Sequence, residues 1–261
     1  MGCDTWLIDF ISRDDFYKHV KDTVETYSKS LNSYDLEKLN TNIIDPIKLL
    51  LDKYVYDQPW EGIIEREVSR QRDKTNNNAI GYFHQHIFRY IDGCEVPDAG
   101  WDVIYRNDSG IDIGEGGTVS TVYVEMKNKH NTMNSSAASK LRQRMQEQIV
   151  QDDSCACFLV ETIAKTSQNI RWAPGKDTQP HKLMRRVSID RFYEIVTGDK
   201  CGFHKICTEL PEAIAAAVDG AQETILPTDT AYSELAQGET DIVKSLYRLA
   251  FSSYSGFEES D

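Results

Sequence analysis

No run of apolar residues in this 261-residue sequence approaches the ~20 that a membrane-spanning helix needs. Its first ten residues also lack the basic segment followed by an apolar stretch that marks a secretory signal peptide. The six cysteines form no Cys-x-x-Cys pair, and no histidine stands at zinc-ligand spacing from them. These absences argue against a membrane or zinc-binding protein and predict a cytoplasmic protein with reduced thiols.

The sequence also has no internal repeat and no linker long enough to separate domains. With 40% hydrophobic residues, a chain of this length can bury one large core. We therefore expect a single domain over 1–261, made of a helical N-terminal part (1–78), a core (79–200) and a helical C-terminal part (201–261).

Basic residues are outnumbered, and the formal net charge of −13 normally argues against a polyanionic partner. The charge is unevenly distributed, however. The segment 127–191 holds twelve Lys and Arg residues against six Asp and Glu, so the acidic excess lies in the rest of the chain. A basic face on an acidic body is compatible with DNA contact, although a solvated helix would show the same composition.

Helical patterns dominate the first ninety residues. The polar stretch 71–78 interrupts them, and a further helix is predicted over 79–91. In the C-terminal part, Pro211 is expected to begin an alanine-rich helix, because proline fits the first helical turn. A last helix is predicted around 242–251.

The segment 119–127 is rich in β-branched and aromatic residues, which predicts a strand. Residues two apart in a strand point to the same face. Glu125 and Lys127 should therefore project together, while Val124 and Met126 project the other way.

A second alternating segment lies about twenty residues upstream, with Trp101 and Val103 on one face and Asp102 on the other. The connection 107–117 is dense in Gly, Asp and Asn, which favours a turn. An antiparallel hairpin of the two strands would bring Asp102 beside the glutamate and lysine of the second strand.

Two carboxylates and a lysine converging in this way form a divalent-metal site with a cation next to it. Mg²⁺ takes one or two carboxylates together with water and phosphate oxygens, so Asp102 and Glu125 would bind it. The backbone carbonyl of Met126 would complete the site, and Lys127 would orient the attacking water and offset charge on the phosphate. The set favours a hydrolase, in particular a nuclease. The alternative is an exposed strand ion pair worth roughly 0–1 kcal/mol.

The arrangement of these three residues resembles the PD-(D/E)xK nuclease superfamily. The segment 125–136 (Glu-Met-Lys-Asn-Lys-His-Asn-Thr-Met-Asn-Ser-Ser) is similar to type II restriction endonucleases that cut the interrupted palindrome GGNCC. The segments 100–104 (Gly-Trp-Asp-Val-Ile) and 159–170 (Leu-Val-Glu-Thr-Ile-Ala-Lys-Thr-Ser-Gln-Asn-Ile) are similar to the same branch. The resemblance covers approximately residues 78–175.

The resemblance implies a restriction-endonuclease-like α/β fold, in which helices flank a mixed central β-sheet and further helices are added at both ends. It also implies Mg²⁺-dependent hydrolysis of phosphodiester bonds in double-stranded DNA at a short palindrome, GGNCC. A palindrome is matched by two-fold protein symmetry, so a homodimer is expected. A DNA methyltransferase that protects the same site is expected as its genetic partner.

Two positions fit the superfamily pattern only in part. Pro97 and Asp98 spell its "PD" literally, but Asp98 precedes a glycine turn, so we expect Asp102 to be the acidic residue of the site. The resemblance also places Gln85, on the predicted helix 79–91, at an auxiliary metal-site position that usually holds Glu. A glutamine there argues against a second metal ion.

A helix over 136–150 and a continuously apolar strand over 156–161 follow the motif, and this order favours a parallel crossover. Basic residues of the helix would meet phosphates. Polar residues after the strand would read base edges, because Asn and Gln pair with adenine and Arg with guanine. The candidate DNA-contacting residues are Asn128, Lys129, His130, Asn131, Asn134, Ser135, Ser136, Lys140, Arg142, Arg144, Gln168, Asn169 and Arg171.

Two other functions fit the same residues. The chain could be a DNA-binding module of this fold that does not cleave, or a nuclease that serves repair or recombination. The intact set of Asp102, Glu125 and Lys127 favours the cleaving enzyme.

Overall fold

The computed structural model describes residues 6–130, 132–175, 178–219, 228–238 and 242–251. The chain forms two compact units: the sheet unit, Met1–Val24 with Ile80–Gly220, and the helical unit, Glu25–Ala79 with Ala221–Asp261. Helices α1 (Arg13–Ser28) and α4 (Trp60–His86) continue from one unit into the other. The boundary after Ala79 lies one residue from the division expected at 78, whereas the sheet unit also includes residues 1–24 and ends at 220 instead of 200. The assignment of 1–261 to one domain remains a prediction.

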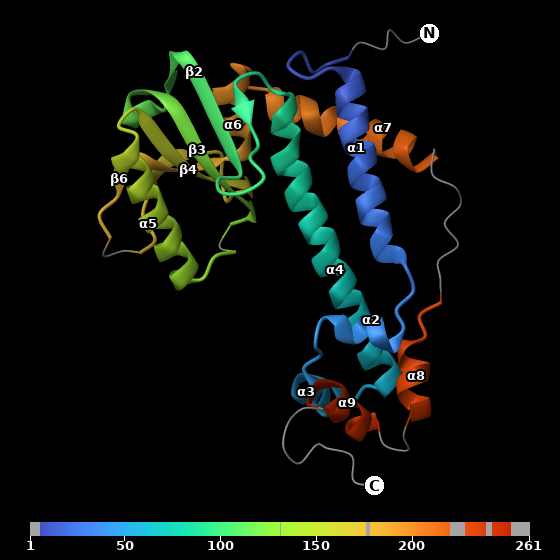
Figure 1. Cartoon of the computed structure of the whole chain (residues 1–261). Coiled ribbons are helices and arrows are strands. Elements are labelled where there is room, and N and C mark those ends of the chain that lie inside the picture. Colours follow the sequence, from blue (N-terminus) through green and yellow to red (C-terminus); the bar gives the residue numbers. More distant parts are fainter. Residues whose placement is uncertain (1–5, 131, 176–177, 220–227, 239–241, 252–261) are drawn as a thin grey trace. The chain divides into compact units, whose positions relative to one another are not determined.

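The sheet unit is built on a six-stranded mixed sheet of order β1-β2-β3-β4-β6-β5 (Figure 1). Its strands are β1 (Cys94–Glu95), β2 (Val103–Asp112), β3 (Thr118–Lys129), β4 (Cys155–Ile163), β5 (Asn169–Trp172) and β6 (His181–Ser188). The strands β1, β2 and β3 pair antiparallel, β3, β4 and β6 pair parallel, and β5 pairs antiparallel with β6 at one edge. The prediction of a mixed sheet flanked by helices is confirmed.

Helices cover both faces of this sheet. The described helices and turns that lie wholly in the sheet unit are η2 (Ile87–Tyr90), η3 (Gly114–Gly116), α5 (Ser135–Gln151), α6 (Ile189–Thr197) and α7 (Gly202–Asp219). Helix α5 lies against one face of the sheet and α6 against the other (Figure 1). The predicted helix 136–150 and the predicted parallel strand 156–161 correspond to α5 and β4 and are confirmed.

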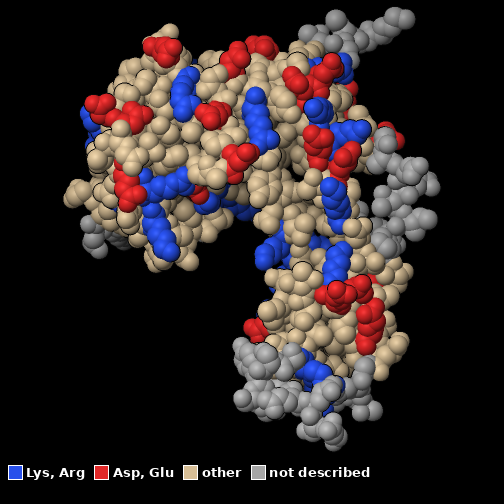
Figure 2. All heavy atoms as spheres, in the orientation of Figure 1, with Lys and Arg blue, Asp and Glu red and all other residues tan. Residues whose placement is uncertain are grey.

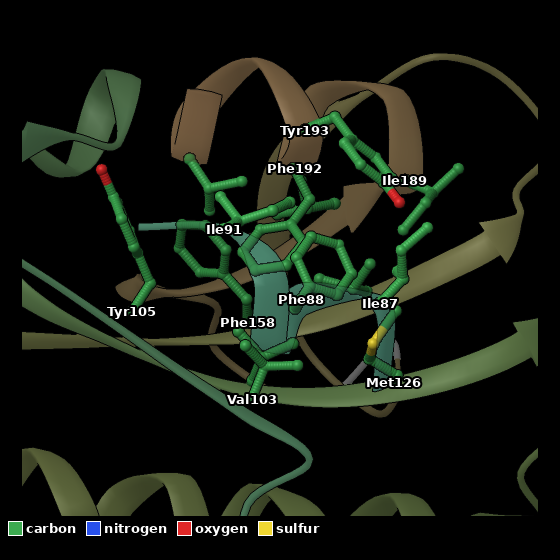
Figure 3. Close-up of a cluster of buried hydrophobic side chains, with 14 of the residues drawn as sticks. Ile87, Phe88, Ile91, Val103, Tyr105, Met126, Phe158, Ile189, Phe192 and Tyr193 are labelled. Atoms are coloured by element: carbon green, nitrogen blue, oxygen red, sulfur yellow. The ribbon is translucent and has the colours of Figure 1, made fainter. Parts of the chain in front are cut away.

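The α6 face holds the largest apolar cluster. In Figure 3, Phe88 and Phe192 pack with Phe158 of β4 above Val103 and Met126, which come from the two strands of the hairpin. Removing this much aromatic surface from water is the main stabilisation of the sheet unit. It fixes β2 and β3 against the helices, and thereby fixes the residues on the opposite face of these strands.

The hairpin of β2 and β3 is longer than predicted. We expected a turn over 107–117, but β2 continues to Asp112 through an irregularity in its register, so the first half of that prediction is wrong. In the described part of the chain, β1 pairs with β2 only at Tyr105 and the residue before it. The Gly, Asp and Asn residues that follow therefore indicate an exposed strand edge and not a turn.

The predicted face of Trp101 is also wrong. Val103 belongs to the cluster on the α6 face, whereas Trp101 packs with Ile104 under α5. The regular alternation begins only at Val103, because Asp102 forms a bend ahead of the strand. Trp101 thus lies on the same side of the sheet as the predicted active-site residues.

Three other boundaries differ from the prediction. The predicted break at 71–78 does not exist, because the stretch has no Gly or Pro and Gln71 is buried, with its Nε2 donating to the Leu39 carbonyl at 3.0 Å. Helix α7 begins at Gly202, not at Pro211, because Ile206 and its apolar neighbours already pack on the core. The polar segment after β4, for which no strand was predicted, contains the short edge strand β5.

The helical unit has its own core. In addition to parts of α1 and α4, it contains η1 (Lys29–Leu31), α2 (Leu36–Thr41), α3 (Pro46–Val55), α8 (Ala231–Gly238) and α9 (Ile242–Phe251). Leu39, Leu49, Ile64, Leu235 and Leu246 are buried together. The predicted helix 242–251 is confirmed as α9. Among the described residues, no helix has both the length and the apolar character needed to cross a membrane.

Candidate active site

Asp102 is fixed against β3 by two hydrogen bonds. Its backbone N–H donates to the Val124 carbonyl at 2.9 Å, and its side-chain Oδ2 accepts the Met126 N–H at 2.7 Å. The first bond holds the backbone of Asp102 against β3, and the second holds its carboxylate there. Because the N–H and C=O of one residue leave a strand on the same side, the Met126 carbonyl points toward Asp102 as well.

Glu125 and Lys127 project from β3 toward the α5 face, as predicted, because Tyr123 of the same alternation packs under α5 and Met126 packs on the opposite face. The Lys127 ammonium donates to Glu125 Oε1 at 2.6 Å. The two side chains are 30% and 17% exposed, respectively. This partial burial makes the pair more than an ordinary surface ion pair.

Arg144 of α5 joins the same group. Its Nη1 lies 3.2 Å from Glu125 Oε2, and its guanidinium carbon lies 3.9 Å from the centre of the Trp101 ring. The sequence prediction grouped Arg144 with the phosphate-contacting residues of the helix and missed this placement. Helical periodicity offered a signal, since Arg144 neighbours the buried Met145 on the sheet-facing side of α5.

The two carboxylates of the cluster repel each other. Burial raises the pKa of Asp102, and the negative charge of Glu125 raises it further. The Met126 N–H and the positive charges of Lys127 and Arg144 act in the opposite direction. A second carboxylate nearby disfavours the ionised form of the first. A divalent cation that binds between the two stabilises the ionised forms of both.

The residues present fit a Mg²⁺ ion with few protein ligands. In the described part of the chain, no three His, Cys, Asp or Glu side chains gather to hold a metal ion. Asp102 and Glu125 supply two carboxylates, and the Met126 carbonyl supplies a third oxygen. The hard Mg²⁺ ion commonly keeps water and substrate phosphate oxygens in its remaining positions.

The structure does not join Gln85 or Asp98 to this cluster. Gln85 lies half-buried in the last turn of α4, and Asp98 is exposed between β1 and β2. No hydrogen bond or ion pair described for either residue reaches Asp102 or Glu125. The role of Gln85 and the choice of Asp102 over Asp98 remain predictions.

The residues that follow the motif divide into two groups. Asn128 and Lys129 end β3, Asn131 lies outside the described residues, and Asn134 caps α5 by accepting the Ala137 N–H at 2.8 Å. Ser135 and Ser136 are exposed in the first turn of α5. Lys129, Asn134, Ser135 and Ser136 are exposed, so they offer polar atoms to solvent at the end of β3 that follows the active-site residues.

His130 instead belongs to a second cluster that the sequence did not predict. Its Nδ1 lies 3.1 Å from Glu161 Oε2 and 2.9 Å from Arg186 Nη2, and Arg186 also binds Glu161. Glu161 is only 2% exposed. Burial opposes its ionisation, but the hydrogen bonds from Arg186 and His130 keep its pKa below the usual value.

The basic residues of α5 differ from one another. Lys140 is exposed, whereas Arg142 Nη2 donates to the Gln179 carbonyl at 2.8 Å. Because Arg142 and Arg144 bind partners within the chain, Lys140 is better placed than either of them to meet a phosphate. Basic and acidic side chains are interspersed on the face of the sheet unit that Figure 2 displays.

The predicted base readers on and before β5 already have partners within the chain. Asn169 accepts hydrogen bonds from the buried Arg185 at its side-chain Oδ1 (2.8 Å) and its backbone carbonyl (2.6 Å). Arg171 pairs with Glu115 at 3.1 Å, and both side chains are largely exposed. Gln168 is half-buried, and its backbone N–H donates to Ser188. Of the three, Arg171 is the side chain that can most readily be released to a ligand.

Comparison with known proteins identifies the class. The family model described as Eco47II restriction endonuclease matches residues 8–219, so the chain belongs to that family. It is a type II restriction endonuclease, a hydrolase that cleaves double-stranded DNA site-specifically. The predicted class is thereby confirmed, and the family implies a divalent metal cofactor.

Two relatives are type II restriction enzymes by name. The type II restriction enzyme Sau96I of Staphylococcus aureus is 26% identical over 217 residues, which cover 79% of this chain and 79% of the relative. The type II restriction enzyme Eco47II of Escherichia coli is 26% identical over 221 residues, which cover 80% of this chain and 87% of the relative.

Proposed function

We propose that Asp102, Glu125 and Lys127 are the catalytic centre of a Mg²⁺-dependent enzyme of the PD-(D/E)xK type, on a restriction-endonuclease-like core. The observation that carries this proposal is the approach of Asp102 to the Met126 N–H, one residue from Glu125. Asp102, Glu125 and the Met126 carbonyl would hold the ion. When bound, a divalent ion polarises the scissile phosphate and lowers the pKa of water.

Lys127 supplies the cation that acts on the reacting groups. Its ammonium lies 2.6 Å from Glu125, a proposed ligand of the ion, and this proximity supports a role for Lys127 beside the reacting phosphate. There it orients the attacking water by hydrogen bonding and offsets the negative charge that builds on the phosphate oxygens. Water gives up a proton and attacks phosphorus, the bond from phosphorus to the leaving deoxyribose oxygen breaks, and that oxygen takes up a proton from solvent.

The finer points of substrate and assembly belong to the same proposal. The resemblance of the segment 125–136 to enzymes that cut GGNCC supports that sequence as the recognition site. A palindrome offers two equivalent strands, so one active site for each strand requires a homodimer with two-fold symmetry. A methyltransferase that modifies the same sequence would protect the host DNA.

Digestion of phage-length DNA tests this function. We expect discrete fragments with Mg²⁺, no cleavage with EDTA, and binding without cleavage with Ca²⁺, which occupies oxygen sites but activates water poorly. A smear would indicate a nonspecific nuclease, and a mobility shift without cutting in Mg²⁺ would indicate a DNA-binding module that does not cleave. Fragment ends outside GGNCC would refute the assigned site alone.

Variants at the two candidate aspartates provide the matched control. Asp102→Ala and Glu125→Ala should abolish cutting, because each removes a ligand of the ion. Asp98→Ala should retain it, because Asp98 is exposed and has no described contact with the cluster. If Asp98 proves essential and Asp102 dispensable, the assignment of the metal ligands is wrong.

A further inference from the structure

Two side chains of α5, one helical turn apart, hold Trp101. Gln148 Oε1 accepts the indole N–H at 3.0 Å, and the Arg144 guanidinium covers the ring face at 3.9 Å. Trp101 is 7% exposed and directly precedes Asp102. A guanidinium stacked on a buried indole loses much of its freedom, so its position is set by the fold.

The guanidinium of Arg144 also contacts Glu125. Arg144 binds Glu125 Oε2 at 3.2 Å while Lys127 binds Oε1 at 2.6 Å, so both oxygens of this carboxylate are occupied. The cluster contains two carboxylates and two cations, and their formal charges cancel. A dication that enters it meets as many positive charges as negative ones.

We propose that Arg144 is a positioning residue of the active site, and not one of the phosphate-contacting cations of α5. It holds the carboxylate of Glu125 and keeps the metal-free site electrically neutral, so that a divalent ion is taken up weakly until a DNA phosphate supplies further negative charge. This inference rests on the proposed function of Asp102 and Glu125.

Two effects of Arg144 on a metal ion oppose each other. Its hydrogen bond orients a metal-binding carboxylate, and loss of such a bond commonly weakens metal binding. Its positive charge repels the ion directly. The Arg144 side chain is 37% exposed and that of Glu125 is 17% exposed, so solvent screens the repulsion of a dication bound by Glu125 only in part. We take this repulsion to be the larger effect, so removal of the charge should tighten metal binding.

The coupling to DNA follows from the same charges. With the ion bound, the cluster carries a net positive charge that a phosphate diester offsets in part. Bound ion must then increase the affinity for DNA by the same factor by which bound DNA increases the affinity for the ion, because coupling between two binding sites is reciprocal. Without the Arg144 charge, the ion binds more readily alone and gains less from DNA.

Isothermal titration calorimetry of the full-length protein with Mn²⁺, in the absence of DNA, tests the proposal. Arg144→Met keeps an apolar stem over Trp101 and removes the charge. We expect it to bind Mn²⁺ roughly tenfold more tightly than the wild type. Lys140→Met, the same loss of charge at an exposed position of the same helix, should leave the Mn²⁺ affinity within about twofold because its charge is solvated.

Two further variants separate the effect of the charge from an effect on the fold. Arg144→Lys restores the charge and should return the Mn²⁺ affinity toward the wild-type value, which a merely structural role would not predict. Arg144→Gln serves as a second neutral variant if Arg144→Met unfolds at the assay temperature. Unchanged or weaker Mn²⁺ binding in the folded neutral variant overturns the proposal, as does equal tightening in Lys140→Met.

Failure of the underlying function gives a different pattern. If the wild type cuts DNA with Mg²⁺ but the neutral Arg144 variants show no tightening, only the role of Arg144 is refuted. If cutting requires no divalent ion, or if Glu125→Gln cuts like the wild type at every Mg²⁺ concentration, the proposed active site is refuted, and the role of Arg144 with it.

Discussion

Lys127 of β3 and Glu161 of β4 are register partners in the parallel part of the sheet, so their side chains leave the same face at adjacent positions. They nevertheless bind different partners: Lys127 pairs with Glu125, and Glu161 with Arg186 and His130. The active-site face thus carries two separate charged clusters side by side. This separation leaves the Lys127 ammonium free to act within the first cluster.

Lys127→Ala should leave specific DNA binding in Ca²⁺ nearly unchanged, while the cleavage rate in Mg²⁺ falls by several orders of magnitude. The proposed contact of Lys127 with water and phosphate strengthens in the transition state, so its loss lowers turnover more than affinity. Single-turnover cleavage and Ca²⁺-supported binding measure the two effects. Lys182→Ala, at an exposed position of β6, is the matched control. Cleavage by Lys127→Ala within tenfold of the wild type would contradict the assignment.

Asp102→Asn should stabilise the metal-free protein at neutral pH, by about 0.5–2 kcal/mol in the free energy of unfolding. Burial and the Glu125 charge raise the folded-state pKa of Asp102 above its unfolded value, so the ionised carboxylate destabilises the fold. This penalty is fully present above the folded-state pKa and disappears as pH falls below the unfolded value.

Urea unfolding of the wild type and Asp102→Asn across a pH series measures this difference. The gain should shrink steadily from pH 7 into the acid range. Asp98→Asn should show no such gain, because Asp98 is exposed. A gain that grows toward acid pH would show that the sign of the pKa shift is wrong.

Glu161→Gln should destabilise the protein at neutral pH by about 2–4 kcal/mol, because it leaves the Arg186 charge without its buried partner. Despite the opposing effect of burial, Arg186 and His130 lower the folded-state pKa of Glu161. The stabilisation is therefore present above the unfolded pKa and is lost as pH falls through the folded-state value. Thermal unfolding should show a lower unfolding temperature for Glu161→Gln than for the wild type at pH 7, and similar unfolding temperatures for the two proteins in acid. A constant difference would contradict the ionic origin of the effect.

Local patterns were sufficient to predict α5, β4 and the antiparallel pairing of β2 with β3, but not the length of β2. Strand alternation placed Glu125 and Lys127 on one face, and it needs only neighbouring residues. Alternation failed at Trp101, because a bend at Asp102 resets the faces, and this bend depends on hydrogen bonds to a strand more than twenty residues later.

The contacts that define the rest of the site join distant positions. His130 and Arg186 are 56 residues apart, and Arg144 reaches Glu125 from the next helix. No spacing in the sequence specifies such pairs, because they depend on strand order and on how α5 packs on the sheet. Local signals existed for single members of these pairs: Glu161 is an acidic residue at the end of an apolar strand, and Arg144 neighbours the buried Met145 on α5.

Sequence-specific recognition of DNA should depend on Arg171 and not on Lys140. Arg171 lies on the edge strand β5, and its exposed pair with Glu115 can open to release it for a base edge. Arg171→Ala should cost ~1–3 kcal/mol of binding free energy on the cognate site and little on random DNA. Lys140→Ala should weaken binding to both DNAs alike and lower the salt slope by about one unit, because one fewer counterion is released.

Glu115→Gln provides an independent check, since removal of the competing carboxylate should strengthen cognate binding. Affinities for both DNAs at two salt concentrations distinguish these outcomes. Equal losses on both DNAs for Arg171→Ala would place base recognition elsewhere, with the exposed polar residues after β3, such as Ser135 and Ser136, the next candidates.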